Sequence, residues 1–223
     1  MLFSPIKVGT TEVKNRVFMP PVSTNLADHG YVTDDLVDHY RARAKGGVGL
    51  IITEVVTVEP TYTYLPGDMC CYDDTFIPGW EKLAAAVHEY GCKIMPQLFH
   101  PAYMAFNIPG TPRLDRPVFC GPVLCPPRRR APSRLTRSTS SRISSGDAAV
   151  RMQKAGVDGV EVHAAHAHGM LGGFFDPALQ QAYRRVWRLA RRPHALLARG
   201  RRRDSRTLRQ GLHHRVRISG DEY

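Results

Sequence analysis

Short apolar runs and segments of helical periodicity alternate along this chain. Residues 48–54 and 93–99 are almost continuously apolar, as strands buried on both faces of a sheet should be. Before the first run, apolar residues recur at helical spacing between an N-cap at Thr33 and a stop at Gly46, and residues 80–90 show the same spacing. This alternation predicts right-handed strand–helix–strand units and a parallel sheet.

The remaining pattern extends this architecture. We predict a hairpin within residues 2–14, a short strand at 16–22, the tail of a helix at 147–155, and strands at 160–162 and 216–219. No glycine-rich dinucleotide fingerprint follows the first strand and no Walker sequence occurs, which counts against a nucleotide-binding doubly wound sheet. The predicted fold is therefore α/β, a partial (β/α)8 TIM barrel with about five of its eight strands.

Three histidines follow the predicted strand at 160–162, namely His163, His166 and His168. The carboxyl edge of a parallel sheet is where α/β proteins place their chemistry, so this cluster is a candidate site. The residues alone leave three interpretations open: a site of chemistry at the sheet edge, histidines with ordinary structural partners, or a metal site with few carboxylates nearby.

The formal net charge of +11 is concentrated in the second half of the chain. Residues 1–122 contain 10 Lys and Arg against 13 Asp and Glu, whereas residues 123–223 contain the other 21 and 7. Two Arg-rich segments, 128–145 and 180–215, stand where the alternation calls for amphipathic helices. Their composition is typical of GC-rich coding DNA translated in another frame. The alternative is a basic nucleic-acid-binding protein on a degenerate barrel scaffold, which is disfavoured because the arginines lack interleaved aromatic residues.

Cysteine usage and hydropathy indicate the compartment. The five cysteines are odd in number and form neither a CxxC pair nor a disulfide framework, so we predict reduced thiols. No apolar run approaches eighteen residues, and the chain does not open with a basic region followed by an apolar one. These features predict a cytoplasmic protein without a membrane span.

With the strands placed, several stretches resemble the flavin-dependent Old Yellow Enzyme family, and most closely its NADH:flavin oxidoreductase and 2,4-dienoyl-CoA reductase branch. They occur in the family's order and at about its spacing. The matching stretches are residues 2–8, 14–25, 40–54, 96–100, 156–166 and 216–219. The resemblance implies that residues 1–223 form the N-terminal part of an FMN-binding barrel.

The resemblance also assigns roles toward FMN, which the family holds at the carboxyl ends of its barrel strands and reduces with NAD(P)H. Gln97 would hydrogen-bond the pyrimidine edge of the flavin, and Arg217 would place a positive charge near N1. The other implied flavin contacts lie after the first two barrel strands, and they are Pro21, Val22, Ser23 and Val55.

By the same resemblance, His163 and His166 would donate hydrogen bonds to the carbonyl oxygen of an enone or enoyl-CoA substrate. The family's tyrosine proton donor falls at His168, and a histidine titrates near neutrality. Pro20 and Val22 depart from the family's usual residues. The last three strand–helix units, which carry the phosphate site of such barrels, are expected to be missing, and self-association through the open barrel edges is expected.

Overall fold

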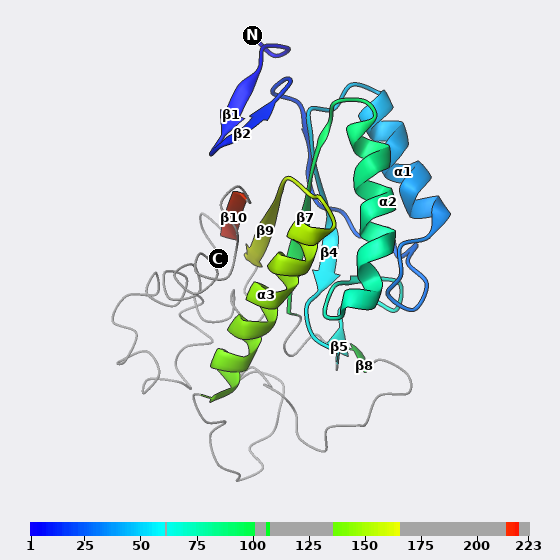
Figure 1. Ribbon diagram of the computed structural model, residues 1–223, viewed down its shortest axis with the longest axis vertical. Coiled ribbons are helices and arrows are strands. Elements are labelled where there is room, and N and C mark those ends of the chain that lie inside the picture. The colour runs from blue at the N-terminus through cyan, green and yellow to red at the C-terminus, as the bar shows by residue number, and fades with distance from the viewer. Residues whose placement is uncertain (61, 101–105, 108–135, 166–212, 219–223) are drawn as a thin grey trace, which may run out of the picture.

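A parallel sheet organises the chain in the computed structural model, which describes residues 1–60, 62–100, 106–107, 136–165 and 213–218. Neighbouring strands follow the order β10–β9–β7–β4–β3, and every pair along this path is parallel (Figure 1). The strand bounds are Phe18–Met19 for β3, Leu50–Thr57 for β4, Lys93–Phe99 for β7, Gly159–Ala164 for β9 and His213–Ile218 for β10. The sheet thus contains the five parallel strands that the sequence predicts, in barrel order.

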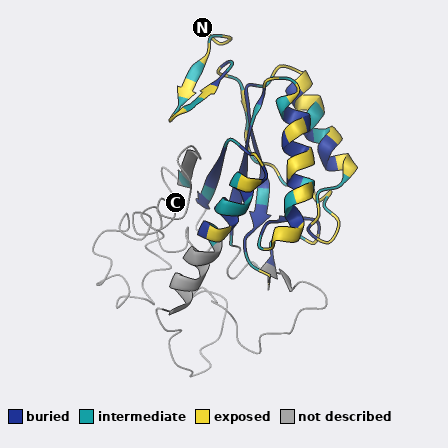
Figure 2. Cartoon of the chain, in the orientation of Figure 1, coloured by how far each residue is buried: buried dark blue, intermediate teal, exposed yellow. Residues whose placement is uncertain are grey.

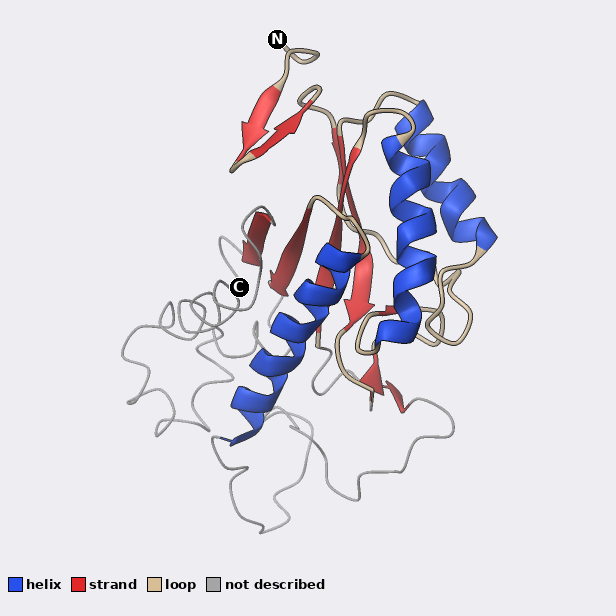
Figure 3. Ribbon diagram, viewed as in Figure 1, coloured by secondary structure: helices blue, strands red, loops and turns tan. Residues whose placement is uncertain are grey.

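Three helices cover the outer face of this sheet (Figure 3). They are α1 at Asp34–Lys45, α2 at Ile77–His88 and α3 at Thr136–Lys154. Helix α2 packs on β7, α3 packs on β7 and β9, and α1 lies beside α2. Thr33 caps α1 as predicted, because its hydroxyl accepts a hydrogen bond from the Leu36 amide. A 3-10 turn at Asp74–Phe76 leads into α2.

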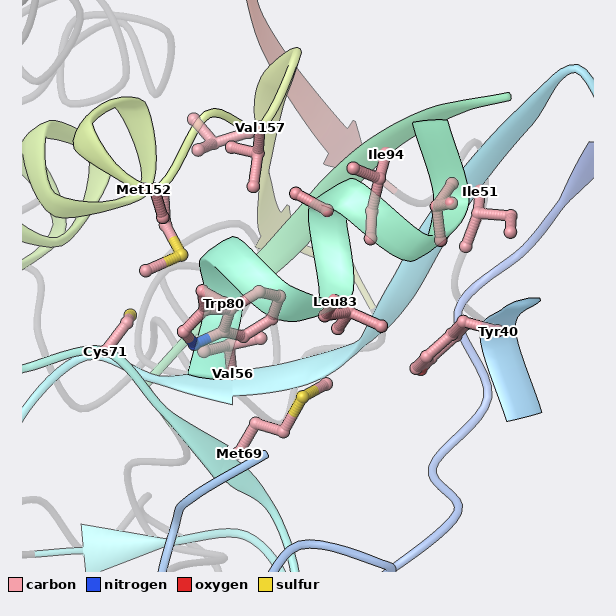
Figure 4. Packing of buried hydrophobic residues seen from close by; sticks show 14 of the residues in the cluster. Tyr40, Ile51, Val56, Met69, Cys71, Trp80, Leu83, Ile94, Met152 and Val157 are labelled. Atoms are coloured by element: carbon pink, nitrogen blue, oxygen red, sulfur yellow. The ribbon is translucent and has the colours of Figure 1, made fainter. Parts of the chain in front are cut away.

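The main hydrophobic core lies between the outer sheet face and the helices, whose exposed faces are turned to solvent (Figure 2). Trp80 and Leu83 of α2 meet Ile51 and Ile94 of the sheet there (Figure 4). The Trp80 indole is completely buried, and its N–H donates to the Cys70 carbonyl at 3.1 Å. This core accounts for the apolar spacing of the helices, since each turns one stripe toward the strands.

A second, smaller core lies on the opposite, inner face of the sheet. Strands β1 at Ile6–Val8 and β2 at Thr11–Val13 form the predicted antiparallel hairpin. Val13 of this hairpin packs against Leu50, Ile52 and Met95, near the amino ends of β4 and β7. The hairpin therefore covers the inner face at the end opposite to the carboxyl edge.

Smaller elements surround the carboxyl edge of the sheet. Strand β6 at Met69–Cys70 pairs with the end of β4. Strands β5 at Tyr62–Thr63 and β8 at Phe106–Asn107 form an antiparallel pair. None of the helices in the described ranges is long and apolar enough to cross a membrane.

Several element bounds differ from the sequence prediction. The strand expected at 16–22 is reduced to Phe18–Met19, because the prolines that follow cannot donate to a strand ladder. Helix α3 begins at Thr136, so part of the Arg-rich segment 128–145 is helical at the place where the alternation calls for a helix. Most of the second segment, 180–215, lies outside the described residues, and the nucleic-acid alternative that depends on it stays untested.

Candidate active site

Four of the predicted site residues lie near the carboxyl ends of the parallel strands, in rows that Glu161 joins. Val55 of β4 is in register with Gln97 of β7, and Gln97 is in register with Glu161 of β9. Two residues beyond Glu161 along β9, His163 is in register with Arg217 of β10. Residues in register on parallel strands share a face, so each set forms a row across the sheet.

These rows lie on the inner face of the sheet. Ile94 and Leu98 of β7 belong to the core beneath the helices, whereas Met95 belongs to the inner core with the hairpin. Because side chains alternate along a strand, Gln97 shares the inner face with Met95. The candidate site therefore lies on the inner face of the sheet, at the carboxyl ends of the strands and away from the end that the hairpin covers.

A β-bulge in β4 puts Val55 in this row. Ile52 pairs with Met95 and Val55 pairs with Gln97, so β4 contains one residue more than β7 between these pairs. Without the extra residue, Val55 would turn to the helical face of the sheet. The bulge contains Thr53 and Glu54, and both side chains are fully buried.

Glu54 holds the loop that follows β3. Its two carboxylate oxygens accept hydrogen bonds from the Thr24 amide and, at 3.1 Å, from the Thr24 hydroxyl. The Glu54 amide donates to the Tyr40 hydroxyl at 3.0 Å, which joins the bulge to α1. Burial raises the pKa of Glu54, while the hydrogen bonds from Thr24 act in the opposite direction.

The loop held in this way carries Pro21, Val22 and Ser23. Pro21 and Ser23 are half-buried, whereas the Val22 side chain is 61% exposed. Asn25, in the left-handed region with φ of 60°, ends this stretch and accepts from the Gly67 amide at 2.7 Å. The loop therefore extends past the carboxyl end of β3 with an apolar side chain available to a ligand.

The Gln97 amide is bonded to a carboxylate. Its Nε2 donates to Glu161 Oε1 at 2.7 Å, and each of the two side chains is only 2% exposed. Such a contact, formed away from water, is among the stronger hydrogen bonds in proteins. It joins β7 to β9 at the level of the lower row.

His163 has a defined hydrogen-bonding direction. The ring is 7% exposed and lies 4.7 Å from the ring of Phe99, centroid to centroid. The Ala165 amide donates to its Nδ1 at 3.3 Å. A neutral ring that accepts at Nδ1 must carry its proton on Nε2, so His163 offers an N–H donor there. His166 and His168 lie outside the described residues.

Two further titratable groups have shifted pKa values near this edge. Burial lowers the pKa of His100, directly after β7, to about 4, so this histidine is neutral at pH 7. Burial raises the pKa of Asp68 to about 6, against hydrogen bonds from Leu65 and Thr63, and the Glu54 charge raises it further. Burial is the main cause of both shifts.

Sequence reasoning missed three buried carboxylates, Glu54, Glu161 and Asp68. For two of them a signal was present, because Glu54 and Glu161 are acids inside apolar strand runs. An acid at such a position requires a hydrogen-bond partner, and this marks it as a structural or functional group. Asp68 lies in a loop, where acids are common, and only its burial distinguishes it.

The residues of the two rows fit FMN by their chemistry. An amide, a guanidinium and an imidazole N–H suit the polar edges of a flavin, and Val55 suits its ring face. No group of three or more His, Cys, Asp or Glu suited to a metal ion occurs among the described residues, and the metal interpretation of the three histidines stays untested because His166 and His168 lie outside them. Parallel strands in this order, with outer helices and polar side chains at the carboxyl edge, define part of a (β/α)8-barrel enzyme.

Comparison with known proteins gives the family. The sequence profile of the NADH:flavin oxidoreductase / NADH oxidase family matches residues 1–182. An NADH oxidase of Thermoanaerobacter brockii is 40% identical over 180 residues, which are 79% of this chain and 27% of that protein. An NADPH dehydrogenase of Halalkalibacterium halodurans is 30% identical over 180 residues, 79% of this chain and 51% of that protein.

A solved structure agrees with this assignment. The Old Yellow Enzyme homologue of Zymomonas mobilis superposes with a TM-score of 0.76 at 25% identity, covering 97% of this chain and 62% of its own. The chain belongs to the NADH:flavin oxidoreductase / NADH oxidase family, the family of the Old Yellow Enzymes. Its members are oxidoreductases that use FMN, with NAD(P)H as the hydride donor. The chain spans about half or less of the length of these two curated relatives.

Proposed function

We propose that this chain forms the flavin-facing part of an FMN-dependent oxidoreductase that passes hydride from NAD(P)H to the β-carbon of an α,β-unsaturated carbonyl compound. The observation that carries the proposal is the pair of registered rows, Val55–Gln97–Glu161 below His163–Arg217. A ligand lying along the inner face would meet ring-packing and hydrogen-bonding groups at the lower row and a polarising donor above. Family membership supports the same chemistry.

Each residue of the rows has a proposed part in holding the cofactor. Gln97 binds the pyrimidine edge, and Val55 with Pro21, Val22 and Ser23 provides the surroundings of the ring. Arg217 supplies a fixed positive charge, which stabilises negative charge well in a site with little water. When bound, FMN supplies the hydride transfer that amino-acid side chains cannot perform.

His163 is proposed to act on the substrate. Its Nε2–H donates to the carbonyl oxygen, which draws electron density from the conjugated double bond and makes the β-carbon electrophilic. The ring needs no reorientation, because Phe99 and the Ala165 amide already hold it. By the family resemblance, His166 is the second donor and His168 the source of the proton for the α-carbon.

Flavin titration of the purified chain tests the proposal. We expect the chain to take up FMN, to lose the flavin absorbance near 450 nm with NADPH under nitrogen, in line with flavin chemistry, and to recover it when 2-cyclohexenone is added. Replacement of Gln97 by Leu is expected to weaken FMN binding. A chain that binds no FMN, or a reduced flavin that 2-cyclohexenone leaves unchanged, would contradict the proposal.

A further inference from the structure

Glu161 is an acid in a place that disfavours acids. It lies in β9 between Val160 and Val162, and its side chain is 2% exposed. A buried carboxylate is costly unless hydrogen bonds replace its water. Its position in register with Gln97 therefore requires an explanation beyond packing.

The contact between the two side chains determines how the Gln97 amide is turned. The two ends of a glutamine amide are similar in size but opposite in hydrogen bonding, so the surrounding partners decide which end points where. An ionised carboxylate only accepts hydrogen bonds. Glu161 Oε1 at 2.7 Å therefore requires Nε2 of Gln97 on the β9 side, which turns Gln97 Oε1 away from β9.

The consequence for ligand recognition is specific. The pyrimidine edge of a flavin presents one donor, N3–H, between two carbonyl acceptors. An amide that turns its oxygen toward N3–H can accept a hydrogen bond from it. The inverted amide would place its own N–H group against N3–H, and two donors cannot form a hydrogen bond. We propose that Glu161 is a positioning residue that makes Gln97 a hydrogen-bond acceptor for flavin N3–H, an inference that rests on the proposed FMN site.

A purely structural role for Glu161 makes a different prediction. If the contact only joined β9 to β7, its loss would weaken the binding of every flavin equally. If it orients the amide, its loss must reduce discrimination between flavins that differ at N3. The discriminating probe is 3-deaza-FMN, in which a carbon atom replaces N3, so that the N–H donor is lost with little change in size.

Binding titrations of the purified chain with FMN and with 3-deaza-FMN test the inference. We expect the unmodified chain to bind FMN at least about tenfold more tightly, because a lost buried hydrogen bond costs roughly this factor. Glu161→Gln should reduce the preference to within about threefold, since a glutamine side chain can both donate and accept and so pairs with either orientation of the Gln97 amide. Gln97→Leu should remove the preference, and Glu89→Gln, at an exposed glutamate, should keep it.

The outcomes separate this inference from the proposed function. An unmodified chain that binds neither flavin overturns both. An unmodified chain that binds both flavins equally, or a Glu161→Gln variant that keeps the full preference, overturns the inference alone. If the variant does not fold, NMR of the unmodified chain decides. One proton of the Gln97 side-chain amide should be shifted downfield by the Glu161 carboxylate, with and without FMN. If both amide protons have the chemical shifts of solvent-exposed side chains, the inference is overturned.

Discussion

Single backbone and side-chain partners set the chemistry of the site at the residue scale. The Ala165 amide leaves His163 with its proton on Nε2, and Glu161 turns the Gln97 amide. Both effects depend on an obligate donor or an obligate acceptor beside a group that can play either part. Direction is thereby built into the site before a ligand arrives, which is how a buried donor stabilises charge that develops during a reaction.

Replacement of His163 by Leu tests the polarising donor. Leucine keeps an apolar contact with Phe99 but removes the Nε2–H group. We expect kcat for NADPH-dependent reduction of 2-cyclohexenone to fall by about 10²- to 10³-fold, the usual effect of losing one such donor. FMN binding, followed by absorbance titration, should change little, because Gln97 and Arg217 remain. An unchanged kcat would exclude His163 from the reaction.

Carboxylates hold the elements around the site in place at the element scale. Glu54 joins the loop after β3 to the bulge in β4, and Asp158 joins α2 to the two central strands through His88, Lys93 and the Ile94 amide. Burial alone would raise the pKa of Asp158, but these hydrogen bonds lower it below its usual value. Each carboxylate thus fixes the relative position of elements that are distant in the sequence.

Replacement of Thr24 by Val tests the hold on the loop after β3. Valine keeps the shape of threonine but removes the hydroxyl that donates to Glu54. We expect the free energy of unfolding to fall by about 1 to 2 kcal/mol, measured by urea denaturation, together with weaker FMN binding. Thr10→Val, at an exposed threonine, is the matched control. Equal stability of the two variants would show that the Thr24 hydroxyl contributes nothing.

Asp68 determines in which direction stability changes with pH between about 7 and 4. Its carboxylate is 1% exposed, and its Oδ1 has no hydrogen-bond partner among the described residues. Because its pKa is raised from 3.8 to about 6 on folding, the folded state binds this proton more tightly than the unfolded state. The free energy of unfolding should therefore rise by up to about 3 kcal/mol as the pH falls from 7 to 4.

Urea denaturation across this pH range measures the effect. Asp68→Asn should flatten the rise, because asparagine does not titrate. Below about pH 4, typical of free Asp, stability should fall again as protonation breaks the hydrogen bonds of Asp158, whose folded pKa is lowered. A profile of the unmodified chain that is flat between pH 7 and 4 would show that Asp68 is not buried in the charged form.

Strand β3, at one end of the described strand order, is the expected site of self-association between whole molecules. Strand β3 pairs with β4 on one side only along this path, and its Phe18 side chain is 53% exposed. An open strand edge with an apolar side chain is a template for pairing with another chain. The predicted self-association through barrel edges therefore has a specific location.

Sedimentation velocity of the purified chain tests this location. We expect the unmodified chain to associate at micromolar concentrations, and Phe18→Lys to shift it toward monomer, because a lysine on an edge strand opposes strand pairing. Phe3→Lys makes the same change at a side chain that is 78% exposed but lies outside the strands, and it should have no effect. A monomeric unmodified chain would overturn the prediction.

Elements with strong local patterns were predictable from the sequence. Helix α1 has the predicted cap at Thr33 and the predicted stop at Gly46, and β7 has the predicted bounds of Lys93–Phe99. Helix α2 begins at Ile77, earlier than the predicted 80, because a 3-10 turn and a proline in its first turn extend it beyond the apolar periodicity. Local signals determine the type of an element better than they determine its ends.

The sequence by itself determined the architecture and the family, because periodicity, caps and motif order are written in neighbouring residues. Through the resemblance it also proposed Gln97, His163 and Arg217 as site residues. Only the tertiary structure decided how these groups are turned. The bond between Gln97 and Glu161 joins residues 64 positions apart, and it exists because the register of β7 and β9 brings them to one row. Hydrogen-bond direction at this site is thus a property of the folded sheet, which no local pattern contains.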